Sequence, residues 1–372
     1  MKLNAPGWSE KTRSGLEGLI TAGSGRGLPV VFDFDNTIVC GDIGEATMAL
    51  LATEGILRTE PIPETLAPPF MSRRGKMISL RDCPDVTVYY EELLDATWRA
   101  GNDPAPFSNG YVWAVQIMQG LTALDVVRAT ERVHAMSEPF REKSIEVTTG
   151  KSAYPVPFFY PEMVELIAAL LDNGFDVWII SASNVWSVRW MVLRPLNSLL
   201  TAHGCNRGIR PDRVVGLSML LADREGRQYK DPLLARSDSG YAGMEYTVLS
   251  ELTITGMVQY PAPVYSGKVA NIIDLIGRPP YLAAGDSPGD LPMLAFSENR
   301  LWIARLEKPG YQKEAAGAAA REGGRWMVQP ALCRAVPGFI DDTVMLEGIF
   351  HGEVPATVAE SIEAVHPLIS KS

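Results

Sequence analysis

The sequence predicts an α/β fold in which helices cover a parallel sheet and a helical segment is inserted early in the chain. Apolar, β-branched runs at 28–35, 176–181 and 281–285 are typical of buried strands, and 301–304 is a candidate fourth. An amphipathic helix is expected at 161–173, before the second strand, and another through 269–276, before the third. Because strands and helices alternate, we expect a parallel, Rossmann-like sheet with helices on both faces.

The inserted segment lies between the first two strands. These strands are more than 130 residues apart, which is too far for a simple crossover. Residues 41–150 are expected to be mainly helical, and Thr122 and Asp125 form a capping box that opens a helix towards Met136. We therefore expect a discontinuous core, 1–40 and 151–372, with a helical cap domain at 41–150.

Two further segments carry weaker patterns. Between 213 and 265, β-rich stretches at 246–249 and 252–257 alternate with polar turns and predict a β-flap. Near the end of the chain, Val358, Ile362 and Val365 share one face of a short amphipathic helix that is expected to stop near Pro367 and to pack on the core.

The charge balance excludes some classes of partner. The 372 residues include 34 Lys and Arg against 44 Asp and Glu, a formal charge of −10. Clustered basic residues hold nucleic acids and anionic membranes, so neither is an expected partner. No secretory leader and no apolar run of about 18 residues is evident, which predicts a cytoplasmic protein without a membrane partner. The sequence leaves the oligomeric state open.

Two carboxylates, Asp33 and Asp35, leave the end of the first strand. One of such a pair can attack a phosphorus atom, while the other protonates the leaving oxygen and later activates water. Two carboxylates and a phosphate repel one another without a cation, and Mg²⁺ prefers oxygen ligands. The alternative is that this Asp-x-Asp motif is only a turn at the end of a strand.

Polar residues also follow the second and third strands. Ser181 and Ala182 precede a probable helix, where a hydroxyl and free N–H groups form an anion site, although Ser181 is equally suited to a simple N-cap. Asp286 is placed to complete a metal site. Lys268, at a helix start, is suited to balance a phosphoryl charge, or else is a solvated surface lysine.

Taken together and in this order, these motifs resemble those of the haloacid-dehalogenase-like superfamily of phosphohydrolases. The likeness covers about 28–40 and 160–305: Asp33, Asp35 and Thr37, then Ser181, then Lys268, then Asp286 and Asp290. The long insertion after the first motif is similar to the cap of the first type in that family. The resemblance implies the family's α/β core and a Mg²⁺-dependent phosphatase.

The resemblance also implies roles for these residues. Asp33 would be the nucleophile that forms an aspartyl-phosphate, and Asp35 the general acid and base. The metal ligands would be Asp33, Asp35 (through its backbone carbonyl) and Asp286, with Asp290 supporting them from behind. Ser181, Ala182 and Lys268 would hold the phosphoryl oxygens. An acid at position 35 is the mark of phosphatases and phosphomutases rather than dehalogenases.

Within the superfamily the chain is similar to phosphoserine phosphatases and to bacterial phosphorylcholine phosphatases. In the first group an acidic residue nine positions after the nucleophile often meets the substrate amine, and Asp42 holds that place here, where it is equally suited to a helix N-cap. The second group implies an aromatic cage with acidic neighbours. The candidates are Tyr89, Tyr90, Trp98, Trp113 and Trp186, with Glu91 and Glu92. The alternative is that these aromatic residues pack within the core or between the cap and the core.

The sequence thus predicts a phosphomonoesterase that acts on a small, amine-bearing phosphate ester. Two alternatives stay open: a phosphotransferase that passes the phosphoryl group to an alcohol, and a binding protein that keeps the fold without catalysis. The complete set of motifs argues against the second, since a pure binder has no need of Asp35.

Overall fold

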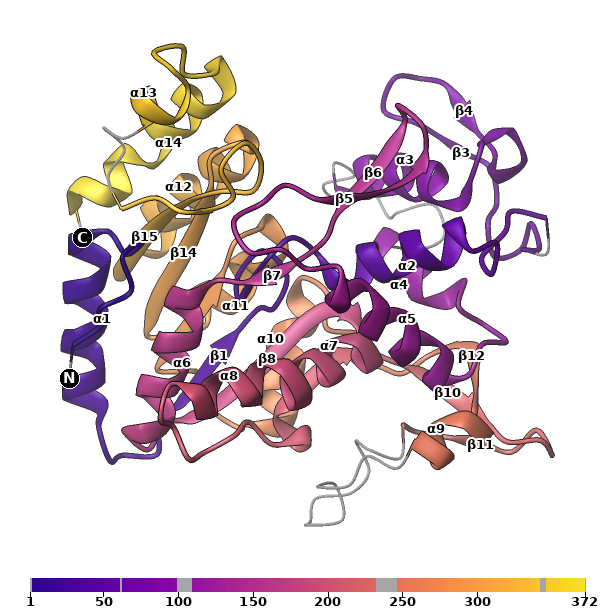
Figure 1. The fold of residues 1–372 in the computed structure, drawn as a ribbon, viewed down its shortest axis with the longest axis horizontal. Coiled ribbons are helices and arrows are strands. Elements are labelled where there is room, and N and C mark those ends of the chain that lie inside the picture. The colour runs from indigo at the N-terminus through magenta and orange to yellow at the C-terminus, as the bar shows by residue number, and fades with distance from the viewer. Residues whose placement is uncertain (1, 61, 99–108, 232–245, 342–345, 372) are drawn as a thin grey trace.

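A parallel sheet lies at the centre of the protein. The computed structural model describes residues 2–60, 62–98, 109–231, 246–341 and 346–371. Within them, the central sheet has seven strands in the order β16-β15-β14-β13-β1-β8-β9, and every neighbouring pair except β15–β16 is parallel (Figure 1). The strands are β1 (Pro29–Phe32), β8 (Asp176–Asn184), β9 (Val214–Leu217), β13 (Leu282–Gly285), β14 (Asn299–Arg305), β15 (Arg325–Leu332) and β16 (Gly338–Phe339). The predicted α/β class is confirmed.

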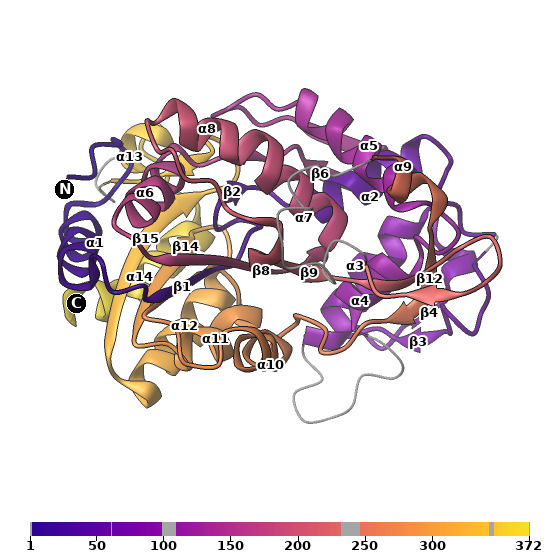
Figure 2. The same ribbon diagram turned by 90° about the horizontal axis from the view of Figure 1, so that it is seen from below.

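Helices cover both faces of this sheet, because successive strand residues point to opposite sides. In β1, Val30 and Phe32 join the core that includes α1 and α6, while Val31 joins the core on the opposite face. The helices of the two layers are visible above and below the sheet in Figure 2. The first layer holds α1 (Glu10–Gly23), α6 (Pro161–Asp172) and α8 (Asn197–Ala202); the second holds α10 (Ser266–Leu275), α11 (Leu291–Ala295), α12 (Pro309–Glu322) and α14 (Ala356–Lys371).

Residues 41–150 form most of a second group of elements beside the core. It contains α2 (Ile43–Thr53), α3 (Val86–Trp98), α4 (Gly110–Gln116), α5 (Ala123–Ala135) and the hairpins β3 (Phe70–Met71) with β4 (Met77–Ile78) and β5 (Ser144–Thr148) with β6 (Ser152–Pro155). The capping box of Thr122 and Asp125 is present at the start of α5, as predicted. The division into core and cap remains our proposal.

A small sheet from later in the chain joins this second group. It consists of β10 (Met219–Ala222), β11 (Gln228–Tyr229) and β12 (Thr253–Val258). The N–H of Gly120 donates to the carbonyl of Ile254 at 2.9 Å, and the amide of Gln116 donates to the carbonyl of Gly256 at 3.1 Å. The predicted strand at 252–257 is therefore present, and it packs against α4 (Figure 2).

Two local predictions were wrong. Residues 246–249 are not a strand but belong to a helix, α9 (Tyr246–Glu251), which packs against α5 and buries Leu249. The last helix, α14, does not stop near Pro367 but contains it. Val358 and Val365 are buried, so this helix packs on the core as expected.

The remaining elements connect these layers. They are β2 (Val39–Cys40) paired with β7 (Phe158–Phe159), α7 (Val185–Met191) with a π-helical turn at Val192–Leu196, and α13 (Leu346–Ile349). No helix in the described part of the chain combines the length and the apolarity that crossing a membrane requires.

Candidate active site

The residues predicted from four separate segments meet at the carboxyl edge of the central sheet. Asp33 follows β1, an inner strand of the sheet, and its N–H continues the sheet by donating to the carbonyl of Ala284 in β13 at 2.9 Å. Ser181 lies in the last part of β8, the other neighbour of β1, and Asp286 directly follows β13. Parallel strands end on the same edge, so this sheet order alone explains why the three side chains converge.

Lys268 ties two of the carboxylates together. Its Nζ donates to Asp33 Oδ1 at 2.6 Å and to Asp290 Oδ1 at 2.5 Å, and all three side chains are buried. Although burial disfavours the charged amine, Asp290 and Asp33 raise the pKa of Lys268. The alternative of a solvated surface lysine is wrong, since Lys268 is 2% exposed.

Asp33 lies in a strongly negative environment. Burial, and next the charge of Asp290, raise its pKa well above the ordinary range, while Lys268 opposes the shift. The hydroxyl of Thr37 lies 3.4 Å from Asp33 Oδ2 and 3.3 Å from Asp286 Oδ1, so it links the first motif to the third. The site therefore favours a group that brings positive charge to Asp33.

Asp35 contacts a different set of groups from Asp33. Its Oδ1 accepts a hydrogen bond from the N–H of Ile43 at 2.7 Å, at the start of α2, and its Oδ2 accepts one from the Ser181 hydroxyl at 3.1 Å. Burial, and then the charges of Asp42 and Asp33, raise its pKa. Ser181 thus contacts the second carboxylate, and it also accepts a bond from the N–H of Ser183 at 3.0 Å.

The loop after β13 is shaped around Asp290. Its Oδ2 accepts hydrogen bonds from the N–H groups of Asp286 and Ser287 and from the Ser287 hydroxyl, at 3.0–3.2 Å. A Cβ at Gly285 would lie 2.5 Å from the Cβ of Asp290, so only glycine fits there without a shift. This arrangement agrees with a supporting position for Asp290, whose role remains a proposal.

Three carboxylates lie close enough together to bind one cation. Oxygen atoms of Asp33, Asp286 and Asp290 lie within 4.8 Å of one another, and all three residues are buried. Burial raises the pKa of Asp286 to about 7, although the charge of Arg305 opposes the shift. The Oδ2 atom of Asp286 is buried without a hydrogen bond from any described residue. A buried all-oxygen donor set in which one oxygen makes no hydrogen bond fits a hard divalent ion such as Mg²⁺.

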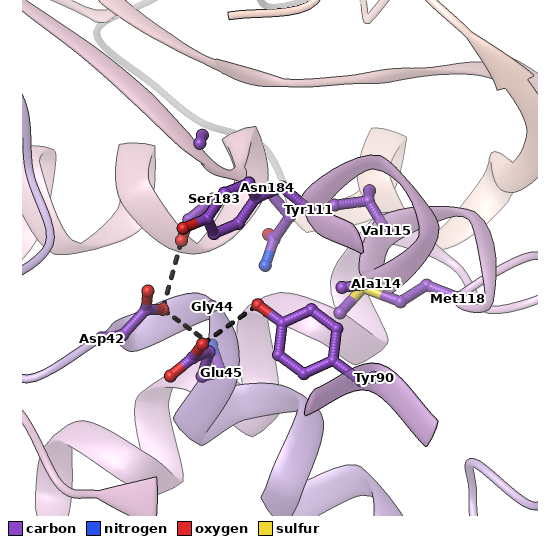
Figure 3. Close-up of a pocket in the computed structure, with 11 residues that line it drawn as sticks. Asp42, Gly44, Glu45, Tyr90, Tyr111, Ala114, Val115, Met118, Ser183 and Asn184 are labelled. Carbon is purple, nitrogen blue, oxygen red and sulfur yellow. Dashed lines mark hydrogen bonds between the residues drawn. The ribbon is translucent and has the colours of Figure 1, made fainter. Parts of the chain in front are cut away.

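A small pocket of about 290 Å³, counting its open mouth, lies between the start of α2, the end of β8 and the helices α3 and α4 (Figure 3). Two carboxylates, Asp42 and Glu45, project from the first turn of α2, and Tyr90 and Tyr111 come from α3 and α4. The other lining residues are Gly44, Ala114, Val115, Met118, Ala182, Ser183 and Asn184. Acidic groups beside aromatic rings and a methionine form a wall suited to an organic cation.

The acidic groups of this pocket are held in place by hydrogen bonds. Asp42 is the N-cap of α2: its Oδ1 accepts from the N–H of Glu45 at 2.8 Å and from the Ser183 hydroxyl at 3.3 Å (Figure 3). The Tyr90 hydroxyl donates to Glu45 at 3.0 Å. Burial, and next the charge of Asp42, raise the pKa of Glu45 to about 8. The two interpretations of Asp42, cap and pocket residue, are therefore compatible.

The proposed aromatic cage is only partly assembled. Tyr90 lines the pocket, whereas Tyr89 and Trp113 pack against each other at 4.8 Å between ring centroids, inside the inserted segment. Trp186 is 2% exposed and is not among the lining residues. Glu91 accepts a hydrogen bond from Tyr154 at 2.8 Å, Glu92 is not among the lining residues, and the side chain of Trp98 lies outside the described residues.

Sequence reasoning missed three residues of this region. Glu45 lies one turn after Asp42 and Tyr111 lies in the first turn of α4, and both line the pocket. Arg305, the last residue of β14, forms an ion pair with Asp286 at 2.6 Å. The strand-end rule that located Asp33 and Asp286 would have found Arg305 as well, because it directly follows the predicted strand 301–304.

Comparison with known proteins gives one curated relative and a structural neighbour. No family model matches the chain. It is 26% identical over 332 residues to the phosphorylcholine phosphatase of Pseudomonas aeruginosa, a match that covers 85% of this chain and 87% of that protein. A conserved protein of unknown function from Anaerococcus prevotii superposes with a TM-score of 0.59 at 20% identity, over 92% of this chain and 98% of its own. The second likeness shows that the fold extends over nearly the whole chain.

Proposed function

We propose that this chain hydrolyses a small cationic phosphate ester with Asp33 as nucleophile. Its motifs resemble those of haloacid-dehalogenase-like phosphatases, and its 26% identity to a phosphorylcholine phosphatase supports a phosphatase. The observation that carries the proposal is the convergence of Asp33, Asp35, Lys268 and Asp286 at one sheet edge, beside a pocket of acidic and aromatic side chains.

In the first half of the reaction, an oxygen of Asp33 attacks phosphorus and the bond from phosphorus to the ester oxygen breaks. Lys268 fixes Asp33 through Oδ1 and supplies a positive charge close to the transferred group. Asp35 gives its proton to the departing alkoxide, so the products are the free alcohol and an aspartyl-phosphate on Asp33. The hydrogen bonds from Ile43 and Ser181 keep the carboxyl of Asp35 in place.

In the second half, water releases the phosphate. Asp35, now ionised, takes a proton from a water molecule as the oxygen of that water attacks phosphorus. The bond between phosphorus and Asp33 breaks, which restores both carboxyl groups and yields inorganic phosphate. The same residue acts as acid and then as base, so no further titrating group is required.

Mg²⁺ is the cofactor that the donor set fits, with Asp33, Asp286 and the backbone carbonyl of Asp35 as the proposed ligands. When bound, the ion neutralises charge on the phosphoryl oxygens and allows a dianionic ester to approach two carboxylates. The proposed contacts of the phosphoryl oxygens are Lys268, the Ser181 hydroxyl and the N–H of Ala182, which lies at the rim of the pocket.

The pocket favours an ester whose alcohol carries a cationic group and no carboxylate. Asp42 and Glu45 supply carboxyl groups, which a cationic group of the substrate favours in the ionised form, and Tyr90 and Tyr111 supply aromatic faces. None of the described residues that line the pocket is an arginine or a lysine, so a carboxylate on the substrate would face Asp42 and Glu45 unpaired. We therefore propose phosphorylcholine or phosphoethanolamine over phosphoserine, in agreement with the name of the curated relative.

Steady-state assays of the three esters with and without Mg²⁺ test the proposal. We expect Mg²⁺-dependent phosphate release, with kcat/KM higher for phosphorylcholine and phosphoethanolamine than for phosphoserine. Asp33→Asn is expected to abolish turnover. Release of phosphate from none of the esters would contradict the phosphatase, while a preference for phosphoserine would contradict only the substrate.

A substitution at Gly44 narrows the pocket while keeping both of its carboxylates. A Cβ at this position would lie 2.4 Å from the Ser183 hydroxyl, on the pocket wall. We expect Gly44→Ala to raise KM for phosphorylcholine more than for the smaller phosphoethanolamine. Gly348→Ala, where a Cβ would meet nothing within 4 Å, is the matched control. Equal effects on the two esters would show that the alcohol does not lie in this pocket.

A further inference from the structure

Arg305 is a largely buried arginine beside the proposed cation site, and the phosphatase mechanism assigns no role to it. It ends β14, the strand next to β13, and its side chain is 13% exposed. Its Nη2 lies 2.6 Å from Asp286 Oδ2, and its guanidinium lies over the ring of Tyr311 at 5.3 Å from the centroid. The side chain is thus held between a carboxylate of the site and an aromatic face.

The pairing of Arg305 with Asp286 is incomplete. Asp286 Oδ2 and Arg305 Nε are both buried and have no hydrogen-bond partner among the described residues, so the 2.6 Å contact is an ion pair without hydrogen-bond geometry. Lys268, in contrast, makes hydrogen bonds to both of its carboxylate partners. Buried polar atoms rarely lack a hydrogen bond, so the absence of one at both atoms is unusual.

Charge explains why an arginine lies there. Three buried carboxylates (Asp33, Asp286 and Asp290) face two cations (Lys268 and Arg305), so the five groups carry a formal charge of −1 when all are ionised. Without Arg305 the cluster would carry −2 in a buried environment, where repulsion between like charges is strong. A bound divalent cation would instead compete with Arg305 for the same carboxylate.

We propose that Arg305 is a positioning residue that serves as the resident counter-charge of Asp286, holding this carboxylate in the metal-free site and yielding it to the divalent cation when the cation binds. The inference rests on the cation site of the proposed function. It explains the incomplete pairing, because a fully hydrogen-bonded arginine would release Asp286 less readily. The affinity for Mg²⁺ then reflects competition between Arg305 and the ion for the carboxylate of Asp286.

Thermal unfolding with Mg²⁺ and with EDTA tests this role without reference to activity. Arg305→Met should lower Tm in EDTA, and Mg²⁺ should restore most of the loss, so the rise in Tm caused by Mg²⁺ exceeds that of the wild type. Calorimetric titration should show Mg²⁺ bound on the order of tenfold more tightly by this variant. Arg305→Lys keeps the charge and should stay close to the wild type in both measurements.

Arg300→Met is the matched control. Arg300 is the second residue of the same strand, is 7% exposed and lies over Trp326, at the opposite end of β14 from Arg305. Its loss should lower Tm equally in EDTA and in Mg²⁺. If Arg305→Met behaves in the same way, with an unchanged rise in Tm and unchanged affinity, Arg305 is a structural residue only and the proposal is overturned.

Two further outcomes keep the experiment decisive. If Arg305→Met folds only in Mg²⁺, the proposal is supported; if it folds in neither condition, Arg305→Gln, which keeps a polar side chain without charge, replaces it in the titration with the same expected result. Absence of Mg²⁺ binding to the wild type would overturn the cation site itself. Mg²⁺ binding with unchanged affinity in the variants would overturn only the role of Arg305.

Discussion

Glu45 offers a quantitative test of the pocket, because its carboxyl is buried close to a second carboxyl, that of Asp42. It accepts a hydrogen bond from Tyr90 and lies on the same helical turn as Asp42. Burial, and next the charge of Asp42, raise its pKa from 4.5 to about 8. Without a bound cation, Glu45 is therefore protonated at neutral pH in the folded protein and ionised in the unfolded chain.

The expected effect of Glu45→Gln on stability follows from this difference. The folded state holds one more proton between pH 4.5 and about 8, so wild-type stability falls as the pH rises through this range, at about 1.4 kcal/mol per pH unit. The glutamine of the variant does not titrate and can still accept the hydrogen bond from Tyr90. The free energy of unfolding of the variant minus that of the wild type should therefore be about 3 kcal/mol larger at pH 7 than at pH 4.5.

Urea unfolding at about pH 5.5, 6.5 and 7.5 measures this difference directly. The gap between Glu45→Gln and wild type should widen with each step and then stop growing above about pH 8. Glu54→Gln, at the exposed C-terminal end of the same helix, where Glu54 pairs with Arg132, is the control and should leave the pH profile unchanged. Parallel profiles for wild type and Glu45→Gln would refute the assignment of a buried, protonated Glu45.

Substitutions at three other positions test the stability of the fold and the placement of Asp290. Arg189→Met should destabilise the protein by about 3–5 kcal/mol in chemical unfolding, because it removes the ion pair that Arg189 forms with the fully buried Asp231 at 2.9 Å. Thr122→Ala should cost about 1 kcal/mol in the same assay by removing one half of the capping box, and Thr122→Ser should restore most of it. Gly285→Ala should displace Asp290 and lower kcat while leaving the far-UV circular dichroism unchanged; an unchanged kcat would show that Asp290 tolerates the shift.

The sequence was sufficient to predict the central sheet and the edge at which its polar residues meet. Asp33, Ser181 and Asp286 each follow or end an apolar strand run, and parallel strands must bring such ends together. Lys268 was predicted in the right helix, but only the structure shows its two carboxylate partners. The pairing depends on the close approach of α10 to the loop after β13, which local patterns do not encode.

The pocket was harder to predict because its walls come from separate helices. Aromatic residues are as useful in a core as in a cage, and Trp113 and Tyr89 are core residues of the inserted segment. Tyr111 lines the pocket because α4 lies beside the end of β8, a contact between segments about 70 residues apart in the chain. The number of aromatic residues indicated that an aromatic cage was feasible. Which of these residues line the pocket depends on tertiary packing, which the sequence pattern does not reveal.

In the proposed mechanism, the first turn of α2 would connect substrate recognition with proton transfer. Asp42 caps this turn and lines the pocket, and the N–H of Ile43, the next residue, donates to Asp35 at 2.7 Å. Removing the charge of Asp42 and removing the cap should therefore have separable effects. Asp42→Asn keeps a good N-cap and loses only the charge, so KM for phosphorylcholine should rise while kcat stays close to that of the wild type.

Asp42→Ala loses the cap as well, at a cost of about 1 kcal/mol to the helix start. Because the N–H of Ile43 then loses its fixed position against Asp35, kcat should fall in addition to the rise in KM. Steady-state kinetics of both variants on phosphorylcholine decide the point. If Asp42→Asn and Asp42→Ala raise KM equally and leave kcat unchanged, the N-cap of α2 has no part in positioning Asp35. Asp42 then acts only on the substrate.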